Sequence, residues 1–229
     1  MKAAAILPVK RFGAAKQRLL DVLDRPARAA VVRAMLADVL AAITEVAEIE
    51  RVIVITGEGR AERIAIDHAR RVKTPIEVMR DPSDAGHSEA ATLGIIRAKA
   101  LSAGAAALLP GDCPLLDPAE LGGALARMRP DRVAVVPDRH GSGTNALLLC
   151  PADAIAPGFG PGSRERHVER AQARGLEVEV SELDSLALDL DTPDDLRELA
   201  VALKQDPERA PKTAAALAAL DLGAVNRPQ

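Results

Sequence analysis

Residues 106–118 read AALLPGDCPLLDP, an apolar run followed by one carboxylate, Asp112. Gly111 and Pro114 turn the chain, and Asp117 opens the next helix as a cap. In open parallel sheets, ligands bind beyond the carboxyl ends of the strands, so Asp112 is a candidate metal ligand. The same aspartate explains a turn cap equally well. This stretch alone leaves both interpretations open.

Apolar runs and helical patterns alternate on both sides of this stretch. Strands are expected over residues 3–8, 51–56, 76–81, 132–138, 144–150, 176–180 and 186–191. Helices are expected to begin near residues 24, 58, 86, 117, 163 and 192. This alternation predicts an α/β fold with a mostly parallel, doubly wound sheet in a single domain. We place that domain at residues 1–204 and interpret residues 205–229 as a linker and a helical appendage, with a helix over 213–222.

The composition excludes several classes of function. The 30 basic and 33 acidic side chains among 229 residues leave a net charge of −3, so no general attraction to nucleic acid or to an anionic membrane is expected. Phe12 and Phe159 are the only Phe, Tyr or Trp residues, which leaves little to stack on the bases of a single strand. The two cysteines do not have the spacing of a zinc site. We also find no apolar run as long as a signal peptide or a membrane span. These observations predict a cytoplasmic protein.

Four cations follow the first expected strand: Lys10, Arg11, Lys16 and Arg18. A phosphate chain would lie at this position, directly after a strand end. The residues do not form a Walker loop, and a solvated basic turn is the alternative. Their position favours phosphate binding.

The helix near residue 86 begins with a glycine and a small hydroxyl, Gly86 and Ser88. Residues of this kind let a ligand approach the N–H groups at the helix start. A plain N-cap role for Ser88 explains the same pattern. Both interpretations stay open.

Ser163 ends a stretch rich in Gly and Pro, residues 156–163, and begins another expected helix. As the N-cap it would also present N–H groups to a phosphate or a carboxylate. Arg164, Arg166 and His167 place positive charge where it opposes the helix dipole. That arrangement is unfavourable for a bare helix and favourable when an anion docks, so we expect an anion site here.

Two further acids, Asp189 and Asp191, end the last expected strand and share one of its faces. We expect Asp189 to meet Asp112 across the sheet and assign Asp191 to the turn that follows. With the cations and the helix starts, these acids describe a site for a nucleoside triphosphate and a divalent cation. Mg²⁺ commonly binds through one or two carboxylates and substrate phosphates, so Mg²⁺ is the expected cofactor.

Five stretches carry a family resemblance that runs from residue 1 to about residue 200: LPVKRFGAAKQRLLDVL at 7–23, LLPGDCPLL at 108–116, GTNALLL at 143–149, FGPGS at 159–163 and LDLDTPDDL at 188–196. In these stretches the sequence resembles the phosphoenolpyruvate or 2-phospho-L-lactate guanylyltransferases of coenzyme F-420 biosynthesis. GDCP and DLDTP mark only the broad nucleotidyltransferase fold, whereas GTNAL followed by FGPGS is more specific. The resemblance implies a Rossmann-like fold of the nucleotide-diphospho-sugar transferase type, shared with glycosyltransferases of the A type.

The resemblance also implies roles for individual residues. The Mg²⁺ ligands correspond to Asp112 and Asp189, and the catalytic residues to Lys16 and Asp112. The nucleotide contacts correspond to Lys10, Lys16, Arg18, Gly86 and Ser88. The contacts to a phosphorylated three-carbon acid correspond to Thr144, Gly160 and Ser163. Before the third helix the family usually has Gly-Leu-Asn, where this chain has Gly86-His87-Ser88.

The reaction that the resemblance implies is transfer of GMP from GTP to the phosphate of a three-carbon phospho-acid, with release of pyrophosphate. Phosphoenolpyruvate is the favoured acceptor, and 2-phospho-L-lactate and 3-phosphoglycerate are the others. Two alternatives stay open: a nucleotidyltransferase for molybdopterin or a polyol phosphate, and a nucleotide-binding regulatory module without catalysis. The Ala-rich C-terminal segment also leaves a homodimer open.

Overall fold

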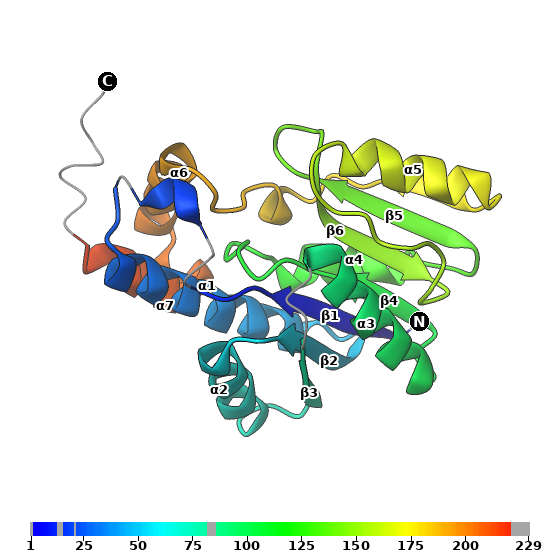
Figure 1. Cartoon of the computed structure of the whole chain (residues 1–229), viewed down its shortest axis with the longest axis horizontal. Coiled ribbons are helices and arrows are strands. Elements are labelled where there is room, and N and C mark those ends of the chain that lie inside the picture. The colour runs from blue at the N-terminus through cyan, green and yellow to red at the C-terminus, as the bar shows by residue number, and fades with distance from the viewer. Residues whose placement is uncertain (1, 13–15, 21, 82–85, 221–229) are drawn as a thin grey trace.

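The computed structural model describes residues 2–12, 16–20, 22–81 and 86–220 of the chain. Its described strands form one seven-stranded sheet in the order β3-β2-β1-β4-β6-β5-β7 (Figure 1). The strands are β1 (Ala3–Val9), β2 (Ile49–Thr56), β3 (Ile76–Arg80), β4 (Ala105–Leu108), β5 (Arg132–Pro137), β6 (Thr144–Cys150) and β7 (Glu177–Val180). Strand β6 runs antiparallel to its neighbours β4 and β5, and the other four pairings are parallel. The prediction of a mostly parallel α/β sheet is confirmed.

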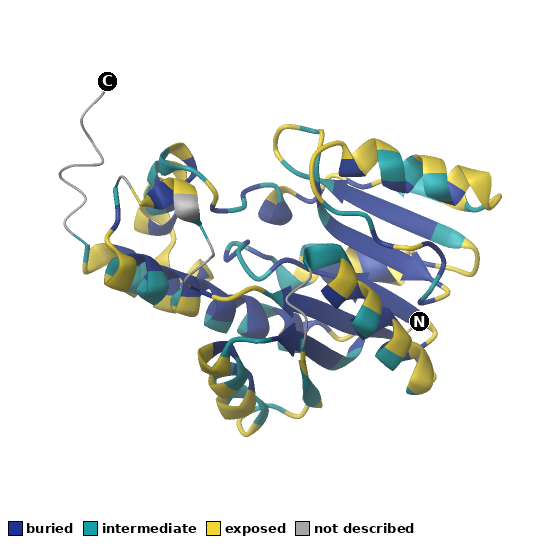
Figure 2. Cartoon of the chain, viewed as in Figure 1, coloured by how far each residue is buried: buried dark blue, intermediate teal, exposed yellow. Residues whose placement is uncertain are grey.

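Helices cover both faces of the sheet. They are α1 (Arg25–Glu45), α2 (Gly59–Ala69), α3 (His87–Ala100), α4 (Pro118–Ala126), α5 (Ser163–Ala173), α6 (Pro193–Gln205) and α7 (Pro211–Ala218), with 3-10 turns η1 (Gln17–Leu19), η2 (Asp184–Leu186) and η3 (Pro207–Arg209). Helices α3 and α5 share one hydrophobic cluster with the sheet, and the other helices share a second. Figure 2 shows buried strands between helices whose outer sides are exposed. Within the described ranges, no helix is long and apolar enough to cross a membrane.

Strand β1 lies at the centre of the sheet because its side chains are apolar on both faces. Residues 3–7 are at most 1% exposed, as in a parallel strand covered by helices on both sides. Helix α3 approaches this strand closely at Gly94, where an added Cβ would lie 2.3 Å from Cγ2 of Ile6. The glycine therefore sets the depth of α3 on the sheet, and with it the place of the helix start near the strand ends.

Several helices begin with the caps that the sequence predicts. Asp24 caps α1, Asp117 caps α4 and Thr192 caps α6, each through a side-chain oxygen that accepts a backbone N–H. The carboxylate of Glu120, in the first turn of α4, accepts the N–H of Ser185 at 3.1 Å. Asp117 is thus a structural residue of the loop that also carries Asp112.

Residues 186–191 are not the strand that the sequence predicts. The segment leaves η2 and continues without pairing to any described strand. Leu186, Leu188 and Leu190 are nevertheless buried, at 1–8% exposure, while Asp189 and Asp191 line a cleft. The alternation in the sequence therefore reflects one buried and one open side of an irregular segment.

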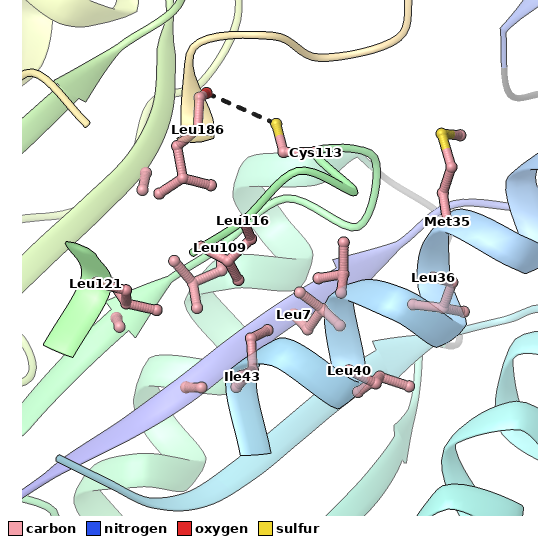
Figure 3. Close-up of a cluster of buried hydrophobic side chains, with 14 of the residues drawn as sticks. Leu7, Met35, Leu36, Leu40, Ile43, Leu109, Cys113, Leu116, Leu121 and Leu186 are labelled. Atoms are coloured by element: carbon pink, nitrogen blue, oxygen red, sulfur yellow. Dashed lines mark hydrogen bonds between the residues drawn. The ribbon is translucent and has the colours of Figure 1, made fainter. Parts of the chain in front are cut away.

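A hydrophobic cluster holds this segment against the loop after β4 (Figure 3). Cys113 and Leu116 of that loop pack with Leu186 and with leucines of α1. The thiol of Cys113 lies 3.7 Å from the carbonyl oxygen of Leu186, and the N–H of Leu190 donates to the carbonyl of Asp112 at 3.2 Å. The core therefore fixes the two acid-bearing segments relative to each other.

Helix α7 lies along α1 (Figure 1). Asp38 of α1 is 4% exposed and accepts hydrogen bonds from the backbone N–H of Thr213 at 2.7 Å and from its hydroxyl at 2.8 Å. The helix predicted over 213–222 is observed at Pro211–Ala218, and its last two predicted residues lie outside the described ranges. The division of the chain at residue 204 stays a prediction.

Candidate active site

A cleft of about 810 Å³ opens at the edge of the sheet where β1, β4 and β5 end and the reversed strand β6 begins. This is the usual place for a ligand site in an open α/β sheet. The predicted site residues that line it are Lys10, Arg18, Ser88, Asp112, Thr144, Gly160, Ser163 and Asp189. Lys16 lines an adjoining pocket that shares Asp112 with the cleft, and Gly86 is the N-cap of α3.

Three carboxylates meet at one end of the cleft. Asp112, Asp189 and Asp191 each place an oxygen within 4.8 Å of the others. The predicted approach of Asp189 to Asp112 is therefore observed. The assignment of Asp191 to the turn is only partly right, because its backbone begins the α6 cap while its carboxylate joins the cluster. The irregular path of residues 186–191 makes this possible.

Lys16 supplies a positive charge to this cluster. Its ammonium contacts Asp112 and lies 2.5 Å from Asp191. Burial lowers the pKa of Lys16, but the two carboxylates outweigh burial and raise it above its ordinary value. The backbone of Lys16 has φ = +56°, a left-handed conformation that non-glycine residues seldom adopt. In this structure the lysine neutralises carboxylates, and its contact with a triphosphate stays a prediction.

The pKa values of Asp112 and Asp189 shift in opposite directions. Burial raises the pKa of Asp112, but the Lys16 ammonium reverses the effect and holds that pKa below its ordinary value. Burial, and then the charges of Asp112 and Asp191, raise the pKa of Asp189 to about 6. Among the described residues, the ammonium of Lys16 is the one cation paired with this cluster of three carboxylates, which leaves the cluster short of positive charge. Clustered carboxylate oxygens of this kind suit Mg²⁺, which prefers oxygen ligands.

Thr144, Gly160 and Ser163 line the same cleft, where the N–H of Arg164 joins the start of α5 to the loop before β6 by donating to the carbonyl of Ser142 at 3.2 Å. Thr144 begins β6 and Ser163 begins α5. The hydroxyl of Ser163 is fully buried and has no hydrogen-bond partner within the described part of the chain. Gly160, with φ = +110°, provides a loop conformation that side chains rarely allow. A buried hydroxyl without a partner is uncommon and indicates a ligand position.

The start of α5 differs from the prediction in two respects. Ser163 is the first helical residue, and Gly162, at φ = +68°, occupies the N-cap position without a side-chain cap. Arg164 and Arg166 donate to carbonyls of the neighbouring loops, those of Gly141 at 3.1 Å and Pro161 at 2.9 Å. These arginines therefore hold loops in place, which explains positive charge at a helix start without a docked anion.

The start of α3 also holds a loop. Gly86 is its N-cap, at φ = +136° and without a side-chain cap, so Ser88 is not the cap. The Ser88 hydroxyl accepts the N–H of Phe159 at 2.9 Å. His87 meets the Phe159 ring edge-on, with ring centroids 4.7 Å apart. His87 and Ser88 thus brace the loop before α5, and residues 83–85 lie outside the described ranges.

Two residues outside the predicted site, Asn145 and Arg139, hold the acid-bearing segment. Asn145 donates to a backbone carbonyl of η2 at 2.7 Å and to Oδ1 of Asp189 at 3.4 Å. Arg139 pairs at 2.5 Å with the buried Asp195, which in turn accepts the N–H of Asp191 at 2.9 Å. Asn145 lies in the GTNALLL motif, and that position is a sequence signal for a site residue. No local sequence pattern links Arg139 to Asp195.

Known proteins resemble this chain in sequence and in fold. A family model described as "Guanylyl transferase CofC like" matches residues 3–208. The chain is 46% identical over 198 residues to the phosphoenolpyruvate guanylyltransferase of Conexibacter woesei, covering 86% of both chains. It is 39% identical over 202 residues to the 3-phospho-D-glycerate guanylyltransferase of Phenylobacterium zucineum, covering 86% of this chain and 89% of that one. A candidate nucleotide-diphospho-sugar transferase of Desulfovibrio desulfuricans shares the fold, with a TM-score of 0.72 and 20% identity over 98% of this chain and 97% of its own.

Proposed function

This chain belongs to the CofC-like guanylyl transferase family, and on that premise we propose that it transfers GMP from GTP to the phosphate of a three-carbon phospho-acid. Phosphoenolpyruvate is the proposed acceptor because a relative 46% identical carries that name. 3-Phosphoglycerate is the second candidate, after a relative at 39% identity. 2-Phospho-L-lactate, and a place in coenzyme F-420 biosynthesis, rest on the resemblance of the sequence motifs.

The observation that carries the proposal is the presence of two unlike groups of side chains in one cleft. The first group, here called the donor end, is the carboxylates of Asp112, Asp189 and Asp191, which suit a cation and the phosphates it accompanies. The second, here called the acceptor end, is the hydroxyls of Ser163 and Thr144, which suit an anion. A transferase that joins a metal-bound nucleotide to an acidic acceptor needs both ends within reach of each other.

At the donor end, Asp112, Asp189 and Asp191 would hold Mg²⁺. The cation would supply charge neutralisation at the phosphates of GTP. Lys10 and Arg18 line the same cleft and would meet the β- and γ-phosphates, which favours departure of pyrophosphate. Lys16, placed between the carboxylates, would keep them oriented or reach the triphosphate.

At the acceptor end, Thr144, Gly160 and Ser163 would hold the phospho-acid with one phosphate oxygen directed at the α-phosphorus of GTP. That oxygen forms a bond to the α-phosphorus as the bond from the α-phosphorus to the bridging oxygen of pyrophosphate breaks. No protein nucleophile is required, because the acceptor phosphate is already an anion. The chain contributes position and charge, the main sources of catalysis in such transfers.

The test is a matrix of the four nucleoside triphosphates against the three phospho-acids, with Mg²⁺ present and pyrophosphate release as readout. Release with GTP and phosphoenolpyruvate, and a product with the mass of the guanylylated acid, is the expected result. Reaction only of CTP with a sugar or polyol phosphate would identify a different nucleotidyltransferase. Binding of GTP without turnover for any acceptor would identify a regulatory module.

A further inference from the structure

His167 is a buried residue of α5 that connects the two walls of the acceptor end. Its side chain is 0% exposed and lies one helical turn after Ser163, on the same face of α5. Its Nδ1 lies 3.0 Å from the hydroxyl oxygen of Thr144. Its Nε2 accepts the backbone N–H of Gly158 at 2.8 Å. The ring therefore joins the start of β6 to the loop before α5.

The contact with Gly158 decides where the ring proton lies. A backbone N–H can only donate, so Nε2 is the unprotonated nitrogen. Burial, followed by the charges of Arg170 and Arg166, lowers the pKa of His167 to about 4. The ring is therefore neutral near pH 7, with its one proton on Nδ1. Nδ1–H donates to Thr144, whose hydroxyl oxygen accepts.

The hydroxyl proton of Thr144 is then left for another acceptor. A hydroxyl carries one donor and two acceptor positions, and His167 occupies one acceptor position. Among the described residues, the Thr144 hydroxyl has no second hydrogen bond. Thr144 lines the cleft beside Ser163, whose buried hydroxyl lacks a partner there as well. Two hydroxyl groups among the residues that line the cleft thus each keep a proton without an acceptor in the described part of the chain.

Contacts of the ring keep His167 from turning over. Phe159 meets its imidazole at a centroid distance of 5.3 Å and an interplanar angle of 73°, and His87 meets the same phenyl ring from another side. A flipped imidazole would also give up both of its hydrogen bonds. The proton on Nδ1 is therefore held toward Thr144.

We propose that His167 is a positioning residue that fixes the Thr144 hydroxyl as a hydrogen-bond donor toward an anionic oxygen of the phospho-acid. The inference rests on the proposed function, because it requires an acidic acceptor at Thr144 and Ser163. If the donor at Nδ1 is lost, no hydrogen bond fixes the orientation of the Thr144 hydroxyl, and its proton is no longer held toward the acceptor. The effect belongs to acceptor binding and leaves the GTP end unchanged.

Two substitutions of His167 separate its two hydrogen bonds. His167→Asn places an amide nitrogen near the position of Nδ1 and can still donate to Thr144. His167→Gln places its amide near the position of Nε2 and lacks that donor. At saturating GTP, we expect the KM for phosphoenolpyruvate to rise ~10- to 100-fold in His167→Gln, the scale of one hydrogen bond to a charged group. It should stay near the wild-type value in His167→Asn, with the KM for GTP unchanged in both.

A double-mutant cycle with Thr144→Val tests whether His167 acts through the threonine. Valine has nearly the shape of threonine and lacks the hydroxyl, so His167→Gln should add little to the rise in acceptor KM that Thr144→Val causes. Independent, multiplicative losses would show a role in general packing and would overturn the inference. Equal impairment by Asn and Gln, in variants with wild-type melting temperatures, would overturn it too.

Side-chain ¹⁵N NMR of the histidines gives a readout that does not require turnover. The wild-type His167 ring should show a protonated Nδ1 and an unprotonated Nε2, and its Nδ1 signal should shift when phosphoenolpyruvate alone is added. A ring protonated on Nε2, or one that does not respond to phosphoenolpyruvate or inorganic phosphate, would refute the positioning role. Absence of pyrophosphate release with every acid would instead refute the proposed reaction, so the two failures are distinguishable.

Discussion

Asp112 belongs to a turn through its backbone and to the carboxylate cluster through its side chain. Asp112→Asn keeps the shape and removes the charge, while Lys16 retains Asp191 as a partner. We expect the kcat for pyrophosphate release to fall by about 100-fold or more, the scale of losing one group that stabilises charge. The melting temperature should change little. A continuous pyrophosphate assay and a thermal melt measure the two quantities.

Asp117 provides the matched control on the same loop. It caps α4 and pairs with Arg209 at 2.9 Å, and it is not among the residues that line the cleft. Asparagine is also a good N-cap, so Asp117→Asn should retain wild-type activity. Normal activity of Asp112→Asn, or equal losses in both variants, would contradict the metal role of Asp112.

The His167 ring makes the stability of the protein depend on pH. Burial, with Arg170 and Arg166, lowers its pKa from 6.5 to about 4. The unfolded state therefore binds more protons between these values, and the free energy of unfolding falls as the pH drops from about 6.5 toward 4. His167→Asn should abolish a pH-dependent loss of roughly 2 kcal/mol.

Urea unfolding of the wild type and of His167→Asn at pH 7 and pH 4.5 measures this difference. The pKa of His87 is also lowered to about 4, chiefly by burial, and that residue is present in both proteins, so the comparison isolates His167. If the free energy of unfolding falls equally in the two proteins between pH 7 and pH 4.5, the His167 ring does not contribute to the pH dependence.

Helix α7 is held on α1 by an aspartate that lies 175 positions earlier in the chain than its partner. Asp38 accepts both the N–H and the hydroxyl of the buried Thr213. Asp38→Ala leaves these donors buried without an acceptor, so we expect the free energy of unfolding to fall by about 2–3 kcal/mol. Denaturant unfolding measures the loss, and activity below the melting temperature should persist because α7 does not line the cleft.

The control for Asp38 is an exposed aspartate on a neighbouring helix. Asp67 of α2 pairs with Arg70 at 3.2 Å, with both side chains more than half exposed. Exposed pairs contribute little, so Asp67→Ala should cost less than about 1 kcal/mol. Equal costs for the two substitutions would show that Asp38 does not hold α7.

At the level of elements, the sequence predicts what depends on local chemistry. Apolar runs predict the strands, and Asp24, Asp117 and Thr192 predict helix starts, because a cap needs only the next turn of the chain. The prediction of a strand over 186–191 is wrong because a strand needs a neighbouring strand to pair with. The alternation of apolar and polar residues does not show whether such a neighbour exists. Ser163 fails as a cap because the left-handed Gly162 takes that position.

In the candidate site, too, the sequence predicts features that depend on local residues and not contacts between distant ones. The sequence predicts Asp112 and Asp189 as site residues because each follows an apolar run, although only Asp112 comes after a strand. The sequence predicts Asp191 only as a turn residue, because its contact with Lys16 joins positions far apart in the sequence. The contact of Arg139 with Asp195 was missed for the same reason. Side-chain geometry between distant loops is set by the packed core and not by local pattern.

For the whole molecule, the cleft couples ligand binding to folding. GTP at about 100 times its Kd would stabilise the native state by about 2.7 kcal/mol, or roughly 5–10 °C in a chain of this length. We expect this shift with Mg²⁺ and a much smaller one in EDTA, because three carboxylates repel a triphosphate that lacks its cation. Thermal melts with and without each component measure it.

The control variant for this measurement is Asp153→Asn. Asp153 pairs with Lys99 at 2.5 Å on the surface and is not among the residues that line the cleft. It should show the full shift with GTP and Mg²⁺, whereas Asp189→Asn should show less. An equal shift in EDTA and in Mg²⁺ would contradict the proposed cation site.

The reversed strand β6 has a consequence for how acceptor preference can evolve. Because β6 starts at the edge where β5 ends, the acceptor end is built by one continuous stretch, residues 138–167. The donor end draws instead on the loop after β1, the loop after β4 and the segment 186–191. Exchange of a single block of the gene can therefore replace the acceptor pocket, provided that the block keeps Asn145 and Arg139, which hold the acid-bearing segment of the nucleotide end. Relatives named for phosphoenolpyruvate and for 3-phospho-D-glycerate would then diverge most within that block.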